Sequence, residues 1–286
     1  MSAAAALLPG GRLHLQHGPI DAIVQAWGEP AEVRAAYAQV VAAFPDILPR
    51  LCAELSLLRS PLPAPKPQGP VAARMHAACA PFASGFITPM AAVAGAVADH
   101  LLAALSEGRR LDRALVNDGG DIAIRLCPGR SFRCGIVADL AAPGLDAIAT
   151  IGAADGVGGI ATSGRRCKGR GGRSFSFGIA DAVTVLAADA ASADAAATVI
   201  ANAVDLPGHP AIERRPAAVI DPDSDLGDRP VTWDVGPLSR QEIARALAAG
   251  AAVAEECHAR GLIRAAILYL RGERAVVGAP SLALAA

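Results

Sequence analysis

Residues 111–137 read LDRALVNDGGDIAIRLCPGRSFRCGIV, and this stretch decides the fold. Apolar and polar residues alternate over residues 111–116, 122–126 and 131–137, as they do in strands that bury one face. Glycine and asparagine separate the alternating runs, which is typical of tight turns between antiparallel strands. The sequence therefore predicts a meander of three strands in the middle of the chain.

Paired strands are also predicted at both ends of the chain. One pair covers residues 12–16 and 20–27, and the other covers residues 262–270 and 274–277. Helices come in blocks and do not alternate with parallel strands, so the pattern favours an α+β class with largely antiparallel sheets. Thr88 and Ser192 stand where helix caps are expected. The remaining predicted elements are helices at 30–44, 47–59, 71–80, 90–105, 192–204 and 239–259, strands at 146–151, 159–162 and 180–187, and a turn-rich region at 206–233.

The composition limits the classes of protein that fit. The 286 residues are 53% hydrophobic and 19% charged, with a net charge of -1, which excludes a disordered chain. With 3% aromatic residues and no basic excess, we expect no nucleic-acid partner. The apolar runs are too short for a membrane span, and residues 1–8 lack the basic start of a signal peptide, so we expect a cytoplasmic protein. Five prolines in residues 60–70 predict a stiff, exposed connection within one domain.

The turn at residues 117–121 is the first candidate binding site. Gly119 and Gly120 allow a backbone to approach a ligand closely, because no side chain intervenes. Asn117 and Asp121 flank them, and a carboxylate there accepts hydrogen bonds from a heterocycle or a ribose hydroxyl. A plain hairpin turn accounts for the same residues.

A polar stretch after the predicted strand at 159–162 is the second candidate. Hydroxyl groups, a glycine and cations suit a phosphate, because backbone N–H groups and guanidinium groups both bind anions. A solvated basic loop is the alternative interpretation. The stretch contains Thr162, Ser163, Gly164 and Arg165, followed by Arg166, Lys168, Arg170 and Arg173.

Two helices carry the remaining candidates. Asp194 and Thr198 are four residues apart and share a helix face, where a carboxylate and a hydroxyl form part of a hard oxygen site for Mg²⁺. Scattered polar residues on a helix are the alternative. Gly95 lies in a small-residue helix start, whose free N–H groups favour anions. Tight helix packing explains Gly95 equally.

The order of these pieces resembles the ApbE family of flavin transferases. It resembles still more closely an uncharacterised, UPF-type branch of the ApbE-like superfamily, over almost the whole chain. The matching stretches are residues 12–13 (RL), 16–20 (QHGPI), 88–98 (TPMAAVAGAVA), 119–122 (GGDI), 162–164 (TSG), 180–185 (ADAVTV), 193–198 (ADAAAT) and 223–227 (DSDLG).

The resemblance implies one ApbE-like domain over residues 1–286, built from two interlocked T-fold-type subdomains with antiparallel sheets and helices packed on them. It also implies cleavage of FAD with Mg²⁺ and attachment of FMN to a Thr or Ser of a target protein. In that family pattern Asp194 and Thr198 bind the metal, with a backbone carbonyl near Val93 or Ala94. The flavin and nucleotide contacts are then Gly95, Asn117, Gly119, Gly120, Asp121, Thr162, Ser163, Gly164 and Arg165.

One departure from the family pattern concerns catalysis. Where the transferases carry a His-Ile-Ile-Asp-Pro-x-Thr-Gly segment, residues 171–181 read GGRSFSFGIAD and hold no histidine. The lysine expected before the helix glycine is replaced by Ala94. No catalytic residue is therefore assigned, and His17 or His100 substitutes only if the fold brings it to the site.

Three functions stay open at this point. The first is a flavin-nucleotide-binding protein with FMN transfer or FAD hydrolysis, which takes a nucleotide-type small molecule and a protein acceptor. The second is a T-fold-type enzyme of pterin or other cofactor biosynthesis, in which an acid such as Asp121 holds the heterocycle. The third is a non-catalytic binding protein. Analogy with T-fold proteins adds homo-oligomerisation as an expectation.

Overall fold

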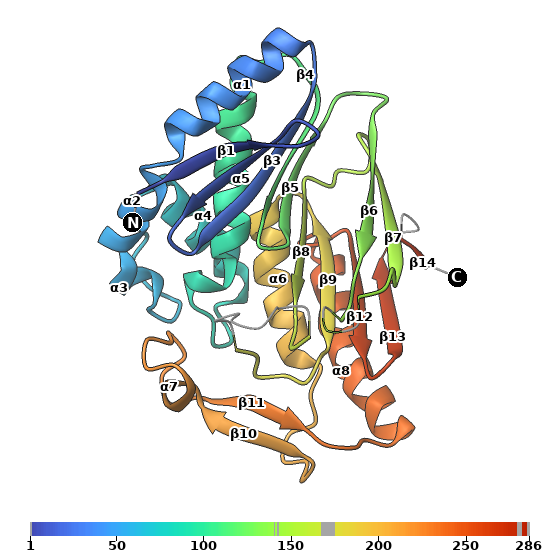
Figure 1. The fold of residues 1–286 in the computed structure, drawn as a ribbon. Coiled ribbons are helices and arrows are strands. Elements are labelled where there is room, and N and C mark those ends of the chain that lie inside the picture. The colour runs from blue at the N-terminus through green and yellow to red at the C-terminus, as the bar shows by residue number, and fades with distance from the viewer. Residues whose placement is uncertain (1, 140, 142, 167–174, 279–281, 285–286) are drawn as a thin grey trace. The chain divides into compact units, whose positions relative to one another are not determined.

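The computed structural model describes residues 2–139, 141, 143–166, 175–278 and 282–284. The chain divides into two compact units whose segments are interleaved along the sequence. Figure 1 shows the helices and strands of both units as labelled below.

The first unit, Met1–Phe132 with Ile151–Ala161 and Leu186–Ala195, is built on an antiparallel sheet. Its strands are β1 (Ala4–Leu8), β2 (Arg12–His17), β3 (Ile20–Gly28), β4 (Leu111–Asp118), β5 (Asp121–Leu126) and β8 (Gly159–Ser163), in the order β1-β2-β3-β4-β5-β8. Every second residue of β3 is buried, as the alternation predicts. Ile122 of β5 pairs with Ile160, which places β8 beside the predicted meander.

Helices of the first unit cover a face of this sheet (Figure 1). They are α1 (Pro30–Ala43), α2 (Ile47–Ala53), α3 (Leu55–Leu58), α4 (Pro70–Cys79) and α5 (Val93–Ser106). Helix α5 packs against β4 and β5, and α1 packs against α5 and β3. Val40, Met75, Leu101 and Leu105 are fully buried, and burial of such side chains is the main stabilising contribution to this core.

The second unit, Arg133–Thr150 with Thr162–Val185 and Ala196–Ala286, contains three groups of strands. All residues of β9 and β12 are buried, as in central strands with both faces covered. Helix α8 (Arg240–Ala259) packs against β12 and β13. The neighbouring strands are β9 (Ala182–Ala187), β12 (Ala265–Leu270) and β13 (Glu273–Gly278), then β14 (Leu282–Leu284), β7 (Ala147–Gly152) and β6 (Ser131–Ile136), and finally β10 (Ile212–Pro216) and β11 (Pro230–Val235).

Helix α8 begins where the sequence predicts, whereas α5 and α6 begin elsewhere. Ser239 accepts the N–H of Glu242 and completes a capping box at the start of α8. Thr88 instead precedes a 3-10 turn, Pro89–Ala92, so α5 begins later than predicted. Helix α6 (Ala190–Ala203) begins before Ser192, because Asp189 accepts the Ser192 N–H at 2.8 Å and takes the cap position.

The proline-rich connection, residues 60–70, is partly packed and not uniformly exposed. Leu62 and Pro67 are buried, and the Leu62 N–H donates to the Ile87 carbonyl at 2.9 Å. Glu54, at the break between α2 and α3, accepts the N–H groups of Gln68 and Gly69 at 2.6 and 2.8 Å. These bonds attach the connection to the helices of the first unit.

Strands β1, β10 and β11 are absent from the sequence prediction. The β1 residues AAALL are all apolar and show no alternation. Strands β10 and β11, together with the short helix α7 (Ala217–Ile220), lie in the region predicted as turn-rich. Prolines at the strand ends and a bulge between Glu213 and Arg214 interrupt the period of two in that hairpin.

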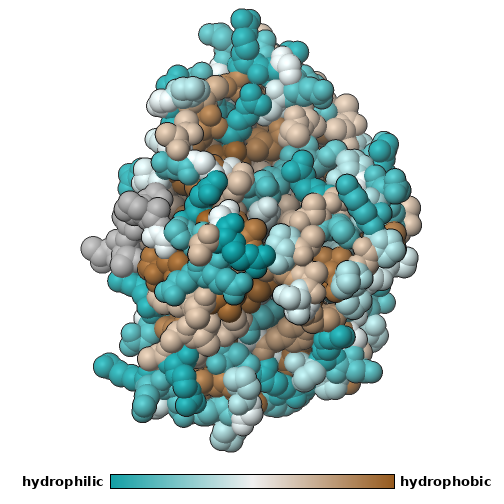
Figure 2. Space-filling view, turned by 180° about the vertical axis from the view of Figure 1, so that it is seen from behind, coloured by the Kyte–Doolittle hydropathy of each residue, from teal (hydrophilic) through white to brown (hydrophobic). Residues whose placement is uncertain are grey.

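One helical segment, Pro89–Ser106, is long and apolar enough to cross a membrane by length and composition. In the structure 61% of it is buried, and a buried core helix meets the same two criteria, so it is weak evidence for a span. Figure 2 shows hydrophilic and hydrophobic residues interspersed over the face seen from behind.

Candidate functional site

The starts of α5 and α6 hold each other in place within the first unit. The Gly95 N–H, in the first turn of α5, donates to Asp194 Oδ2 at 3.1 Å. In return, Asp99 of α5 accepts the N–H groups of Ala190 and Ala191 at 3.1 and 2.9 Å. First-turn amides have no partner inside their own helix, so each carboxylate satisfies donors of the other helix and faces the positive end of its dipole.

The Asp99 carboxyl group is buried, with 8% of the residue exposed. Burial raises the pKa of Asp99 to about 6, and the N–H donors of Ala191 and Ala190 oppose that rise. The Arg74 guanidinium lies 3.8 Å from Asp99 Oδ2. Sequence analysis missed this residue, because a single acid in the apolar stretch around Gly95 gives no sign that it contacts a helix start about 90 residues later.

Glycine allows the backbones to approach closely around the start of α6. A Cβ on Gly95 would lie 2.3 Å from the Ala190 carbonyl oxygen, and a Cβ on Gly159 would lie 2.2 Å from the Ala190 nitrogen. No other residue type fits such contacts without a shift of the backbone. The packing interpretation therefore accounts for the position of Gly95, while its N–H is used by Asp194.

The residues predicted to bind metal lie on one helix. Asp194 and Thr198 are one turn apart on α6, and both are half-buried. Burial, together with the charge of Asp194, raises the pKa of the Cys79 thiol. No group of three or more His, Cys, Asp or Glu gathers among the described residues. The Asp194 carboxylate and the Thr198 hydroxyl are hard oxygen donors, the type that Mg²⁺ prefers.

The candidate flavin contacts form the turn between β4 and β5. Asp118 pairs with Asp121 across the strands, which leaves Gly119 and Gly120 as the two turn residues, with φ of 64° and 110°. The Asn117 side-chain oxygen accepts the Gly120 N–H at 2.8 Å and fixes the turn. A Cβ on either glycine would meet no atom of the described residues within 4 Å. The backbone of this turn is therefore open enough for a flat ring to approach.

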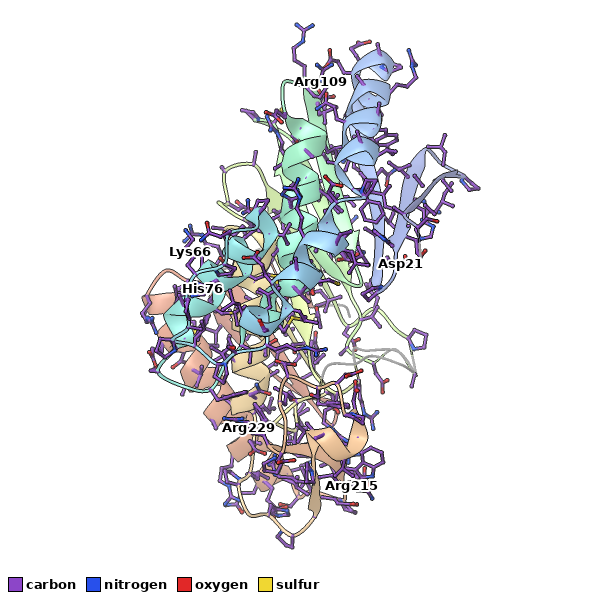
Figure 3. All side chains as sticks on the ribbon, turned by 90° about the vertical axis from the view of Figure 1, so that its left-hand side faces the viewer. Asp21, Lys66, His76, Arg109, Arg215 and Arg229 are labelled. Carbon is purple, nitrogen blue, oxygen red and sulfur yellow. The ribbon has the colours of Figure 1, made fainter. Side chains whose placement is uncertain are left out.

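Asp118 is the buried acid of this turn, and sequence analysis did not select it. The residue is 6% exposed, and its Oδ1 accepts the N–H of Asp21, labelled in Figure 3, at 3.3 Å. Burial raises the pKa of Asp118 to about 7, the Asp21 N–H opposes the rise, and the charges of Asp121 and Asp21 add to it. The buried Asp118 carboxyl group, at the end of β4 next to the two turn glycines, therefore has a pKa near neutral.

The second candidate stretch, in the second unit, is already bonded within the protein. Thr162 Oγ1 lies 2.9 Å from Thr184 Oγ1 of β9, and Ser163 is buried. Gly164 has φ of 147°, and a Cβ there would lie 2.5 Å from the Asp181 carbonyl oxygen. These residues are tightly packed against β9 and the residues before it.

Two arginines of this stretch also have partners inside the second unit. Arg165 donates from its guanidinium to the Trp233 carbonyl at 3.0 Å, and burial lowers its pKa. Arg166 pairs with Asp139 at 2.5 Å and with Asp181 at 3.2 Å. Lys168, Arg170 and Arg173 of the predicted basic loop, and residues 171–174 of the segment that replaces the family histidine, lie outside the described residues.

The two histidines considered as catalytic substitutes contact other parts of the first unit. His17 is buried and packs edge-on against Phe44, with ring centroids 6.1 Å apart. His100 lines a cavity together with residues of α2 and α4. Neither contact involves Asp194, so neither histidine is assigned a catalytic role.

A family model described as AbpE bacteria matches residues 5–276. The chain belongs to this family. Two UPF0280 proteins are similar to it in sequence. The protein from Methanothermobacter thermautotrophicus is 36% identical over 149 residues, which cover 49% of this chain and 51% of that relative. The protein from Methanothrix thermoacetophila is 35% identical over 181 residues, or 61% and 70% of the two chains. The AbpE bacteria chain thus spans about half the length of the first relative.

A solved structure shares the fold of this AbpE bacteria chain. The flavin transferase ApbE from Vibrio cholerae superposes with a TM-score of 0.50 and 13% identity, covering 98% of both chains. Together with the UPF0280 relatives, this likeness confirms the expected ApbE-like branch. It also confirms the predicted α+β fold of antiparallel sheets and packed helices.

Proposed function

We propose that this chain binds a flavin nucleotide with Mg²⁺ and transfers FMN from FAD to a Thr or Ser hydroxyl of a target protein. The observation that carries the proposal is the Asp194 carboxylate, bonded to Gly95 at the start of α5, with the Thr198 hydroxyl one turn later on α6. Family membership and a fold shared with a flavin transferase support the same ligand class.

The residues have separate tasks in this proposal. Asp194 and Thr198 would hold Mg²⁺, which when bound would supply positive charge to the FAD pyrophosphate. Gly119 and Gly120 present an open backbone to the flavin ring, and Asp121 accepts a hydrogen bond from the heterocycle. Gly95 keeps α5 close to α6, whereas Thr162, Ser163, Gly164 and Arg165 are packed or bonded within the second unit and are given no contact with the nucleotide.

The reaction transfers one phosphoryl group. The acceptor hydroxyl oxygen attacks the phosphorus of the FMN half, the bond from that phosphorus to the bridging oxygen breaks, and AMP leaves. Water in place of the hydroxyl gives free FMN instead. Residues 171–181 hold no histidine to take the hydroxyl proton, and a positioned base contributes about 10²–10⁴-fold, so we expect slow transfer.

Calorimetric titration of the full chain with FAD, with and without Mg²⁺, tests the proposal. We expect Mg²⁺ to tighten FAD binding about tenfold or more, because a metal held by Asp194 and Thr198 would offset the charge of the pyrophosphate. Asp194→Asn keeps an oxygen for the Gly95 N–H but removes the charge, and Thr198→Val keeps the shape but removes the hydroxyl. Both variants lose the Mg²⁺ effect. Ser192→Ala, on the same helix, is the matched control and keeps it.

Three outcomes contradict the proposal in different ways. Unchanged Mg²⁺-dependent binding in Asp194→Asn, with a normal melting curve, removes the metal assignment. A rise in melting temperature with a reduced pterin and none with FAD would replace the flavin assignment with a role in cofactor biosynthesis. No response to either ligand removes both assignments.

A further inference from the structure

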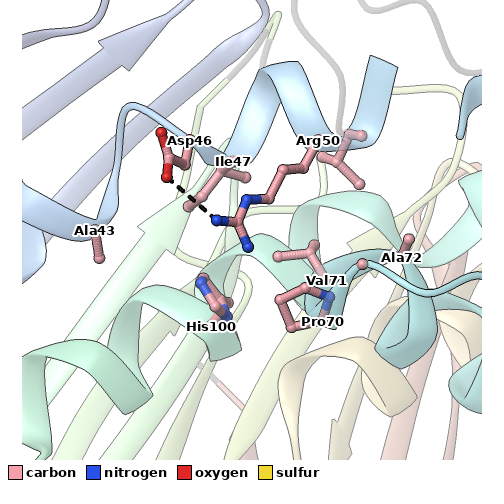
Figure 4. Close-up of a pocket in the computed structure, with 10 residues that line it drawn as sticks. Ala43, Asp46, Ile47, Arg50, Pro70, Val71, Ala72 and His100 are labelled. Atoms are coloured by element: carbon pink, nitrogen blue, oxygen red, sulfur yellow. Dashed lines mark hydrogen bonds and ion pairs between the residues drawn. The ribbon is translucent and has the colours of Figure 1, made fainter. Parts of the chain in front are cut away.

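A cavity in the first unit lies apart from the residues assigned above. It has a volume of about 210 Å³ and is lined by residues of α1, α2, α4 and α5 (Figure 4). That volume is roughly seven times the share of one liquid water, about 30 Å³, and suits a molecule of about seven or eight non-hydrogen atoms. The lining residues are Ala43, Asp46, Ile47, Arg50, Leu51, Gly69, Pro70, Val71, Ala72 and His100.

Most of the wall is aliphatic. Ile47 and Leu51 of α2 and Val71 of α4 are buried and line the cavity. Pro70 adds a further apolar surface at the start of α4. An apolar wall of this size favours a ligand with a hydrocarbon body.

The polar side chains that line the cavity are one cation, Arg50, one carboxylate, Asp46, and the imidazole of His100. Arg50 stands at the rim with 63% of its side chain exposed, and Figure 4 shows its guanidinium between Asp46 and the apolar wall. Its partner Asp46 is 3.3 Å away with 73% of its side chain exposed, and an exposed pair of this kind contributes little stability. The Arg50 guanidinium is thus able to exchange Asp46 for a ligand anion.

Nearby charges affect the pKa of His100, which lies on α5. Burial, then the charges of Arg74 and Arg50, lowers its pKa, so the ring is neutral at pH 7 and keeps one N–H donor. Asp99 lies beside His100 in sequence, but its carboxylate is bonded to the start of α6. The charged groups that lower the pKa of His100 are therefore Arg50 of α2 and Arg74 of α4. Asp46 is the exposed carboxylate at the rim of the cavity.

We propose that this cavity binds a small organic carboxylate. The planar guanidinium of Arg50 matches a carboxylate through two parallel hydrogen bonds, and the His100 ring donates a third. The hydrocarbon part packs against Ile47, Leu51 and Val71. This site is independent of the flavin proposal, because it shares none of its residues.

Titration of the full chain with sodium hexanoate, compared with 1-hexanol, tests this site. We expect hexanoate to bind about tenfold or more tightly than hexanol, because the alcohol has no negative charge and offers the guanidinium one acceptor oxygen where the carboxylate offers two. Arg50→Gln weakens hexanoate binding about tenfold or more. Arg34→Gln, which neutralises an exposed arginine of α1 outside the cavity, is the matched control and leaves binding unchanged.

Histidine titration by NMR gives a second, independent readout. Hexanoate places a negative charge next to His100 and raises its pKa, whereas hexanol leaves the pKa unchanged. The chain has six histidines, and His100→Gln assigns the signal. The proposal is overturned if hexanoate and hexanol bind equally, if Arg50→Gln and Arg34→Gln bind hexanoate alike, or if the His100 titration does not move.

Discussion

Residues 117–120 and residues 162–166 are both short polar stretches with glycine at a strand end, but their surroundings differ. The first stretch is a hairpin turn whose two glycines face open space. The second is packed and internally bonded, and its arginines are engaged with carbonyl and carboxylate oxygens. Similar residue types therefore leave a backbone available to a ligand in the first stretch and serve the fold in the second.

A glycine-to-alanine substitution in each of the two stretches should give the largest difference in unfolding free energy. Gly164→Ala places a Cβ 2.5 Å from the Asp181 carbonyl at φ of 147°, and we expect a loss of about 4 kcal/mol in unfolding free energy. In Gly119→Ala the new Cβ contacts no other atom of the described residues, so backbone strain at φ of 64° is the cost that remains. We expect a loss of about 1 kcal/mol in unfolding free energy. Urea denaturation measures both, and equal losses would refute the difference between the two stretches.

Neutralising Arg166 tests whether the second stretch serves the fold. Arg166→Gln leaves Asp181, 8% exposed, with the Arg271 N–H but without its guanidinium partner, and we expect a loss of about 1–2 kcal/mol. Arg130→Gln is the matched control, because its pair with Asp112 has both side chains more than half exposed and contributes about 0–1 kcal/mol. A loss no larger than that of the control would make Arg166 free for a ligand.

The pH dependence of stability tests whether Asp118, next to the open turn, is protonated in the folded chain. The folded-state pKa of Asp118, about 7, lies above the unfolded value near 3.8, so the folded chain keeps a proton that the unfolded chain has released. The stability that this proton contributes is lost as the pH rises from about 4 through 7. Asp118→Asn carries no charge, so we expect it to be more stable than the wild type by about 1–2 kcal/mol at pH 8.

Thermal melting at two pH values checks the effect of Asp118. At pH 5 the wild type is protonated at Asp118, and the two proteins should melt at similar temperatures. Asp21→Asn is a useful control, because it removes a neighbouring charge and leaves the buried group in place. A gain at pH 5 equal to that at pH 8 would show that ionisation of Asp118 is not its cause.

The sequence predicts the elements whose signals are local. Alternation located β3 and β4, and the apolar period of the long helix predicted at 239–259 located α8. Strand β1 was missed, because its five apolar residues carry no period, and β10 was missed, because a bulge breaks its period. Local patterns thus fail where the register depends on a neighbouring strand.

The candidate site was predictable in residue type but not in contacts. The two glycines of the turn were found from turn chemistry, and the structure places them in a two-residue hairpin. Asp99 and Asp118 were missed, because their importance comes from burial and from partners about 90 residues away. The partners of Arg165 and Arg166 are distant in sequence too. The sequence alone therefore did not distinguish an arginine paired within the fold from an arginine that binds a phosphate.

The reciprocal bonds between α5 and α6 have a consequence for synthesis of the chain. Gly95 and Asp194 are 99 positions apart, and a ribosome adds about 5–20 residues each second. The first turn of α5 is therefore made roughly 5–20 s before the carboxylate that completes it. The apolar side chains of α5 emerge during that interval without the start of α6. The first unit therefore cannot complete its fold until Asp194 has been added to the chain.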